Sequence, residues 1–303
     1  MRQLTPTLFN TLLKGKLHAL LEYVKADDTL DMEFRGNSFT LYYRGGAILI
    51  VEEKPDGIYN WNSITEEYLL EGKNRYEQKH KDAEHFEEYI PEAKHIIDRY
   101  IFLGPKNHLG EKEIQQLVIK ENNYSPNSQD TDYFIVDMEY EETGGIGRFD
   151  LVALRWDSTV AARKKNVVSL AVIEVKQGYY SVRTSTSSPG IHSHTKDFDI
   201  FIEKKSADGS LKDFCEDMVM IFKQKCELGL ILANKKIESI KQDFPISVEN
   251  DIDFICLLAN YKKASENLRN ELAEMDSCKF IRSHYMGYGL YADEIFTLTS
   301  KTI

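Results

Sequence analysis

The chain has 303 residues, of which 42% are hydrophobic and 11% aromatic, enough apolar side chains for a core in one large domain or two smaller ones. Its 49 acidic residues outnumber 38 basic ones, and the resulting net charge of −11 argues against a uniformly basic, phosphate-binding surface. Four scattered cysteines without a Cys-x-x-Cys pair, and no apolar run near the roughly 20 residues of a membrane span, indicate a soluble cytoplasmic protein rather than a disulfide-rich, thiolate-zinc or membrane protein.

The N-terminal part predicts a small α+β domain. Residues 1–25 alternate apolar and polar side chains as an amphipathic helix does. Residues 30–53 are typical of a β-meander of two or three strands, with Arg44-Gly45-Gly46 as a turn. A charge-rich helical pattern follows over residues 63–100.

A linker-like segment at 104–110 separates this part from the rest of the chain. We place the boundary after residue 105. Residues 1–105 are then an accessory domain that selects the substrate or binds a partner, and residues 106–303 are a second domain.

The order of elements in the second domain indicates its fold. It begins with a helix at 111–123, followed by three strands in succession at 133–141, 147–156 and 167–178. A polar loop at 178–196 and a long helix within 211–228 come next. A strand at 254–261, a further helix at 262–275 and a closing strand pair at 279–292 complete the domain. This αβββαβ order predicts a mixed α/β domain with a central mixed sheet.

Charged residues interrupt two of these apolar strands. Successive side chains of a strand point to opposite faces, so Glu174 and Lys176 share one face at the end of an otherwise apolar run. Asp150 interrupts the preceding strand and converges on Glu174 if the two strands pair as a hairpin. Burying such charges is costly unless they pair with each other or with a bound ion, so the pattern predicts a functional cluster.

Two carboxylates beside an ammonium group suit metal-dependent phosphodiester hydrolysis. Hard divalent cations take oxygen ligands and lower the pKa of bound water, and Lys176 can orient the nucleophile or stabilise charge on phosphorus. The pattern Asp150-x(23)-Glu174-x-Lys176 on adjacent strands resembles the motif of the PD-(D/E)xK nuclease superfamily, over about residues 108–260. The segment from Gly147 has the superfamily's Gly-x-x-Asp form, although the proline before the aspartate is absent.

The resemblance implies a restriction-endonuclease-like fold and further site residues. It implies a Mg²⁺ or Mn²⁺ ion held by Asp150, Glu174 and the backbone carbonyl of Val175. Many members add a metal-facing glutamate in the helix before the strands, and Glu111 fits because it lies at the edge of that helix's apolar face. An acidic residue favoured at a helix N-terminus is the alternative for Glu111. Gln177, directly after the lysine, is a candidate for contact with phosphate or nucleophile.

The Glu-x-Lys triplet alone is weak evidence. It begins at six glutamates in this chain, namely Glu52, Glu71, Glu77, Glu92, Glu174 and Glu203. The rival is Glu52-Glu53-Lys54, which also follows an apolar run. Pro55 ends that strand at once, and no helix–strand–strand series delivers an aspartate beside it.

Three other clusters have two interpretations each. His192 and His194, with Asp197 and Asp199, form either a metal cluster or, as we expect, a mobile substrate-contacting segment. The run 163–165, Arg-Lys-Lys, is either a solvated turn or a phosphate contact. Tyr42-Tyr43-Arg44 is either a hairpin that packs its tyrosines or a nucleic-acid surface.

These observations predict a Mg²⁺- or Mn²⁺-dependent nuclease acting on DNA rather than RNA, in restriction, repair or defence, with homodimerisation left open. Two other classes remain. One is a catalytically inactive nuclease fold that binds nucleic acid or protein, and the other is an interaction protein that works through the N-terminal β-meander. Metal binding separates the first prediction from both, because only the nuclease requires it.

Overall fold

The computed structural model describes residues 1–64, 68, 84–103, 110–125, 128, 130–142, 147–178, 181–185, 189–232, 240–259, 266–275, 277–283 and 287–299. The chain divides into two compact units, Met1–Gln116 with Leu228–Leu230, and Leu117–Glu227 with Ile231–Ile303. The division falls inside helix α5 (Glu111–Asn123). Of the linker expected at 104–110, residues 104–109 lie outside the described residues. Within the described ranges, no helix is long and apolar enough to span a bilayer.

The first unit begins with two short helices, α1 (Pro6–Lys14) and α2 (His18–Ala26), where the sequence pattern predicted one. The Thr5 hydroxyl accepts a hydrogen bond from the Leu8 amide and caps α1. Helix α1 ends at Gly15, whose backbone is extended. Glycine is needed at this position, because a Cβ would lie 2.7 Å from the Thr11 Cα. The amphipathic pattern is real, but glycine interrupts the helix that carries it.

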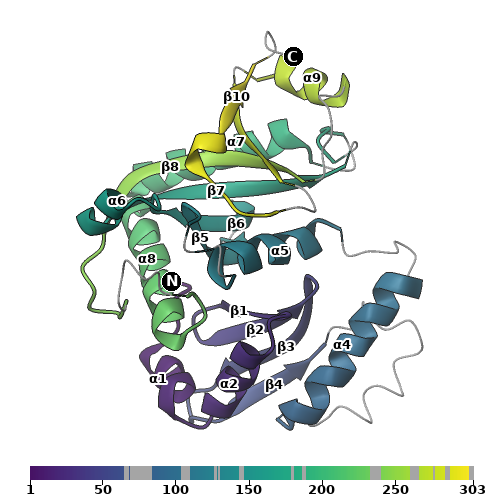
Figure 1. Ribbon diagram of the computed structural model, residues 1–303, viewed down its shortest axis with the longest axis vertical. Coiled ribbons are helices and arrows are strands. Elements are labelled where there is room, and N and C mark those ends of the chain that lie inside the picture. Colours follow the sequence, from purple (N-terminus) through teal and green to yellow (C-terminus); the bar gives the residue numbers. More distant parts are fainter. Residues whose placement is uncertain are drawn as a thin grey trace. The chain divides into compact units, whose positions relative to one another are not determined.

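Four antiparallel strands form the sheet of the first unit, in the order β1-β2-β3-β4. Their bounds are β1 (Leu30–Phe34), β2 (Ser38–Tyr43), β3 (Gly46–Glu53) and β4 (Tyr59–Ser63). The expected turn at Arg44 and Gly45 is confirmed, with φ of 49° and 80°, the left-handed conformation of a tight hairpin. The fourth strand was not expected, although Tyr59 and Trp61 alternate with polar residues in it as strand residues do. Helix α4 (Phe86–Leu103) packs against β3 (Figure 1).

The second unit is a mixed α/β structure, as predicted. Its remaining elements are β5 (Tyr133–Glu141), β6 (Arg148–Arg155), α6 (Val160–Lys165), β7 (Val167–Gln177), α7 (Ile191–Asp208), α8 (Leu211–Leu228), β8 (Ser247–Ala259), α9 (Glu266–Ala273), β9 (Cys278–Ser283) and β10 (Phe296–Leu298). The sheet order is β10-β9-β8-β7-β6-β5 (Figure 1). Strands β5, β6 and β7 are antiparallel neighbours, while β8 runs parallel to both β7 and β9. Strand β7 therefore lies inside the sheet.

Two sequence expectations for this unit were wrong. The polar loop expected over 178–196 ends early, because α7 begins at Ile191. The closing strand pair does not continue through 287–292, since β9 pairs instead with β10. The buried Asn122 amide accounts for the second difference: it donates to the Tyr288 carbonyl at 2.9 Å and accepts from the Leu290 amide at 2.9 Å.

Aromatic side chains fill the space between the sheet and the two long helices. Phe149 of β6 packs edge-on against Phe201 of α7, with ring centroids 5.1 Å apart, and Phe201 packs against Phe214 of α8 at 5.2 Å. Gly147 approaches this cluster with φ of 78°, and a Cβ there would lie 2.5 Å from the Phe201 ring. A glycine is required at this position both for its backbone conformation and for the space beside it.

We expect Gly147→Ala to destabilise the protein more than Gly209→Ala does. Both glycines have φ near 78°, so both substitutions incur the left-handed backbone penalty, about 1–2 kcal/mol. Only at Gly147 does the new methyl group meet a ring, which adds roughly 1–3 kcal/mol of overpacking, whereas nothing lies within 4 Å at Gly209. Urea denaturation of both variants measures the difference, and equal losses would contradict the packing of Phe201 against Gly147.

Candidate active site

The pairing of β6 with β7 brings Asp150 and Glu174 to neighbouring positions. Leu151 pairs with Ile173, and the next position of this antiparallel register holds Asp150 and Glu174. The Asp150 carboxylate accepts a hydrogen bond from the Val175 amide, at 2.7 Å between Oδ2 and N. One end of the β6–β7 ladder thus carries two carboxylates on adjacent strands.

Glu174 is almost completely enclosed, with 3% of its side chain exposed, and its two oxygens have different environments. Oε1 accepts a hydrogen bond from Lys176 Nζ at 2.8 Å and lies 3.0 Å from His194 Nε2. Oε2 is buried and has no hydrogen-bond partner among the described residues. A buried carboxylate oxygen without a partner is costly, so Oε2 is the atom that a cation would stabilise.

The two carboxyl groups differ in acidity. Burial raises the pKa of Asp150 well above its ordinary value, and the charge of Glu174 raises it further, against the opposing effect of Lys176. Burial also raises the pKa of Glu174, but the hydrogen bond from His194 and the charge of Lys176 outweigh it, so the pKa is lowered overall. A pair of acids whose pKa values are pushed apart in this way is typical of catalytic sites.

His194 was interpreted wrongly as part of a mobile loop. It lies in the first turn of α7, and its imidazole reaches Glu174. The metal cluster considered with His192, Asp197 and Asp199 is not formed, since no group of three or more His, Cys, Asp or Glu side chains in the described part of the chain is arranged to hold a metal. The histidine instead belongs with the two carboxylates.

Glu139 is a third acidic residue near this cluster, and sequence reasoning missed it. Met138 pairs with Leu151 and Tyr140 with Phe149, so Glu139 lies opposite Asp150. Its backbone is left-handed, with φ of 54°, and its charge contributes to the raised pKa of Asp150. Like Asp150, Glu139 is an acidic residue that interrupts a largely apolar strand, so the same sequence pattern identifies it.

The remaining predicted site residues differ in burial and in hydrogen bonding. Lys176 is buried, with 4% of its side chain exposed, and forms the ion pair with Glu174. Gln177 ends β7 half-buried, and its carbonyl accepts a hydrogen bond from Ser181. Val175 contributes its amide to Asp150, while the role of its carbonyl stays a prediction, as does that of Gln177. Glu111 begins α5 within the first unit, and its role as a ligand likewise stays a prediction.

Arg163 fits neither interpretation of the basic run at 163–165, whereas Lys164 and Lys165 are exposed, as a solvated segment would be. Arg163 is buried, with 2% exposure, and its guanidinium donates to the carbonyls of Asp157 and Thr131. The same group lies over the rings of Phe134 and Trp156. Arg163 is therefore a core residue that fastens α6 to the sheet, neither a solvated turn residue nor a phosphate contact.

The rival triplet at Glu52 has no acidic neighbour across its sheet. Glu52 pairs with Ser38 on one side and Asn60 on the other, and its carboxylate accepts from Lys54 at 2.6 Å. The neighbouring hairpin residue Arg44 bonds to Asp98 and Glu113, so its guanidinium is engaged within the first unit. Neither segment provides paired carboxylates for a metal.

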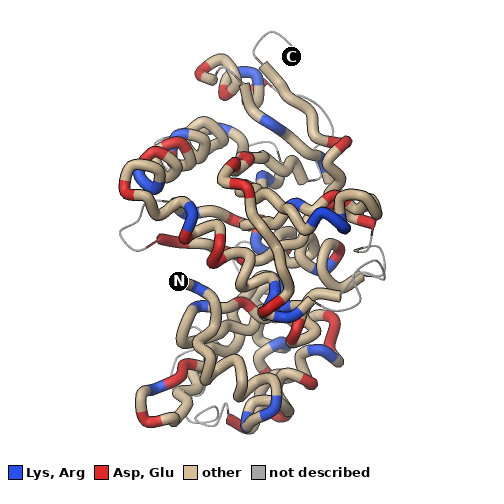
Figure 2. Tube along the Cα trace, turned by 90° about the vertical axis from the view of Figure 1, so that its left-hand side faces the viewer, with Lys and Arg blue, Asp and Glu red and all other residues tan. Residues whose placement is uncertain are grey.

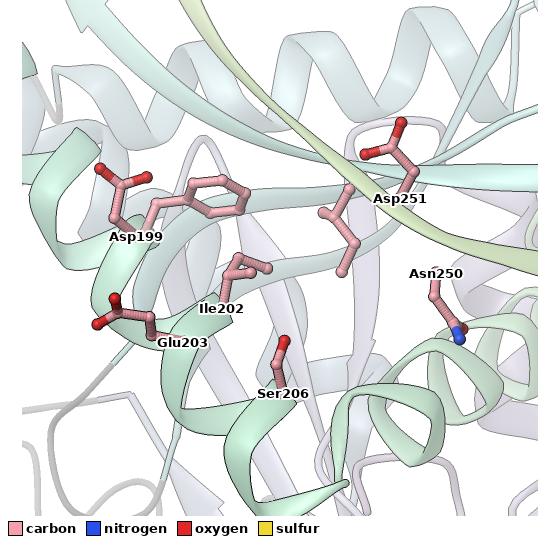
Figure 3. Close-up of a pocket in the computed structure, with 8 residues that line it drawn as sticks. Asp199, Ile202, Glu203, Ser206, Asn250 and Asp251 are labelled. Atoms are coloured by element: carbon pink, nitrogen blue, oxygen red, sulfur yellow. The ribbon is translucent and has the colours of Figure 1, made fainter.

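A cavity of about 600 Å³ lies beside α7 and β8. Asp199 and Glu203 on α7 and Asn250 and Asp251 on β8 surround it (Figure 3). None of the predicted catalytic residues lines it. Its three carboxylates repel phosphate, so the cavity is a poor path for a nucleic-acid backbone.

Comparisons of the chain with protein-family models, with curated proteins and with solved structures found no match.

The residues present fit a hard divalent cation. Such ions use one or two protein carboxylates and keep several waters, so a cluster of three protein side chains is not required. The unpartnered Oε2 of Glu174 and the adjacent carboxylate of Asp150 are oxygen donors of the kind that Mg²⁺ and Mn²⁺ take.

We expect Asp150→Asn to stabilise the metal-free protein at neutral pH. The pKa of Asp150 is raised above its unfolded value of 3.8, so ionisation of this group favours the unfolded chain as pH rises through that range. Asparagine cannot ionise and retains an acceptor for the Val175 amide. The gain should be full above the folded-state pKa and vanish below the unfolded value.

Urea denaturation at neutral and acidic pH, in EDTA, measures this effect. Asp199→Asn on the exposed face of α7 is the matched control and should show no comparable gain. A destabilised Asp150→Asn at neutral pH would show that the ionised carboxylate is favoured by the fold.

Proposed function

We propose that the second unit is a Mg²⁺- or Mn²⁺-dependent nuclease that hydrolyses phosphodiester bonds, in DNA rather than RNA. The observation that carries the proposal is the environment of Glu174 on an interior strand: one oxygen engaged by Lys176 and His194, the other unpartnered, and Asp150 on the next strand. A structural ion pair needs no such unpartnered oxygen.

The topology of the second unit supports the proposal. A helix precedes three antiparallel strands, and a helical crossover then leads to a strand parallel to the third. Apart from the short α6 between the second and third strands, this order is compatible with the αβββαβ core that the resemblance to the PD-(D/E)xK superfamily implies. Asp150 lies on the second strand and Glu174 and Lys176 on the third, the positions that the resemblance implies.

Each residue has a distinct part in the proposed reaction. Asp150 and Glu174 would hold the cation, together with the carbonyl of Val175 that the resemblance implies. When bound, the cation supplies a positive charge against the phosphate and lowers the pKa of a bound water. Lys176 holds an ammonium group within hydrogen-bonding distance of Glu174, so its charge lies beside the ligands and can stabilise negative charge developing on the phosphate.

The acidic balance of the chain limits how nucleic acid can be held. Figure 2 shows Lys and Arg interspersed with Asp and Glu along both units, consistent with the net charge of −11. Binding would then depend on the cation and on local basic groups, and should weaken as salt rises. The direct test is incubation of the full chain with plasmid, linear duplex, single-stranded DNA and RNA, each in EDTA, Mg²⁺ or Mn²⁺. Cleavage in either metal but not in EDTA is expected.

Asp150→Ala and Lys176→Ala should abolish cleavage by different routes. Asp150→Ala should remove the thermal stabilisation by Mn²⁺, since a ligand stabilises only the state that binds it. Lys176→Ala leaves both carboxylates in place, so it should keep a measurable stabilisation by Mn²⁺ while the cleavage rate falls by about 10²–10³-fold, the usual loss for a group that stabilises transition-state charge. Differential scanning fluorimetry and single-turnover cleavage measure the two effects.

Lys54→Ala is the matched control, because Lys54 pairs with Glu52 in the same Glu-x-Lys arrangement outside the candidate site. It should leave both metal stabilisation and cleavage unchanged. Wild-type activity in both Asp150→Ala and Lys176→Ala would refute the site. A wild type that binds nucleic acid equally with and without metal, and cuts none, would support an inactive nuclease fold instead.

A further inference from the structure

A buried carboxylate from α9 connects three segments of the second unit. Glu271, 5% exposed, accepts hydrogen bonds from the Thr184 amide, from the Thr184 hydroxyl at 2.9 Å and from the His192 amide at 3.0 Å. These partners lie 79 to 87 residues earlier in the chain. Glu271 therefore fixes the segment after β7 and the start of α7 at the same time.

This carboxylate caps one amide in the first turn of α7, that of His192. Its N-cap residue is Gly190, which provides no side-chain hydrogen bond. A Cβ at Gly190 would lie 2.1 Å from the Thr184 amide nitrogen, so the close approach of the two backbones excludes any larger residue. The free amides of a helix start need acceptors, and here Glu271 provides the acceptor that a local Ser, Asp or Asn would otherwise supply.

The same helical turn presents His194 to Glu174. His192 donates its amide to Glu271, and two residues later the His194 imidazole lies 3.0 Å from Glu174 Oε1. Lys176 donates to the same oxygen at 2.8 Å, so Oε1 has two polar partners, while Oε2 has no hydrogen-bond partner among the described residues. The position of the α7 start thus places His194 on the oxygen that Lys176 already engages and leaves Oε2 for a cation.

We propose that Glu271 is a positioning residue for the metal site: it holds the start of α7 so that His194 engages Glu174 Oε1 and leaves Oε2 for the cation. The inference rests on the proposed function, since it assigns Glu174 as a metal ligand. A local cap would stabilise α7 equally well, but it would not connect α7 with α9. The Val182–Thr184 segment also contacts the start of α7 directly, because the Ile191 amide donates to the Val182 carbonyl at 3.1 Å and the Gly190 amide to the Thr184 hydroxyl at 3.2 Å. Hydrogen-bonding partners of metal ligands commonly set ligand orientation and metal affinity.

A double-mutant cycle on the full chain tests this connection. The variants are Glu271→Gln, His194→Ala and both together, with Glu274→Gln on the exposed end of the same helical segment as control. Glutamine replaces one accepting oxygen with a donor, so bonds to α7 or Thr184 are lost while side-chain volume is kept. Mn²⁺ affinity, measured by electron paramagnetic resonance without nucleic acid, is the main readout.

Each single variant should weaken Mn²⁺ binding by about 10-fold, the size of effect expected for a partner of a metal ligand. The double variant should be no weaker than His194→Ala alone, because Glu271 acts through His194. Glu274→Gln should bind as the wild type does. Thr184→Val removes one donor to Glu271 and the acceptor of the Gly190 amide, while Thr184→Ser keeps both. Thr184→Val should show a smaller loss than Glu271→Gln and Thr184→Ser none, and this pair serves if Glu271→Gln does not fold.

Two results would overturn the inference. In the first, Glu271→Gln lowers only the melting temperature and leaves Mn²⁺ affinity unchanged, which is the behaviour of a helix cap alone. In the second, the losses of the two single variants add in the double variant. A wild type that does not bind Mn²⁺ refutes the proposed function instead. In that case the imidazole ¹⁵N resonances of His194 test whether Glu271 positions His194 against Glu174. They must shift in Glu271→Gln if Glu271 controls the His194–Glu174 contact.

Discussion

The burial of the Glu174 carboxylate within an interior strand is the constraint on which the second unit depends. A carboxylate with 3% exposure loses most of its hydration, and the fold must replace that hydration with its own donors. Lys176 provides one from the same face of β7, two residues further on, and His194 provides another from α7. The residues that surround Glu174 are therefore part of the packing of the sheet and its helices. The ladder between β6 and β7, the start of α7 and the hydrogen bonds of α9 all meet this single requirement.

The contacts that satisfy Glu174 act on only one of its oxygens. In a buried ion pair that serves the fold alone, both oxygens would have partners, because an unpartnered acceptor costs free energy without return. Here Oε2 is left unpartnered among the described residues, and the neighbouring Asp150 has a raised pKa because burial and the charge of Glu174 disfavour its ionised form. The two unfavourable features occur at adjacent positions and would both be relieved by a divalent cation.

The part of the site that follows from strand alternation could be predicted from the sequence. A period of two makes Asp150, Glu174 and Lys176 conspicuous in apolar runs, and the same regularity places them on neighbouring strands. His194 and Glu271 could not be found in this way, because their contacts span 20 and 79 to 87 residues and depend on how α7 and α9 pack. For Arg163 the sequence predicted an exposed side chain, because it belongs to a basic run. Its guanidinium is buried instead, since the ring faces of Phe134 and Trp156 and two backbone carbonyls compensate for its lost hydration.

The backbone strain at Glu139 also favours a functional over a purely structural role for the cluster around Asp150 and Glu174. Glu139 adopts a left-handed backbone opposite Asp150, a conformation that costs a residue with a Cβ on the order of 1–2 kcal/mol. A glycine or asparagine would relieve that cost but would remove a carboxylate from beside Asp150. Strain of this kind persists where the surrounding structure over-determines it, and it clusters at sites that bind or react. Glu139 also adds to the repulsion that raises the pKa of Asp150, while Arg148 Nη2, 3.7 Å from Glu139 Oε2, partly offsets its charge. The strain at Glu139 and the repulsion at Asp150 are thus two separate costs of placing an acid opposite Asp150. A cation bound among these carboxylates would reverse the electrostatic part of those costs, so the cluster is better suited to holding a positive charge than to stabilising the fold without one.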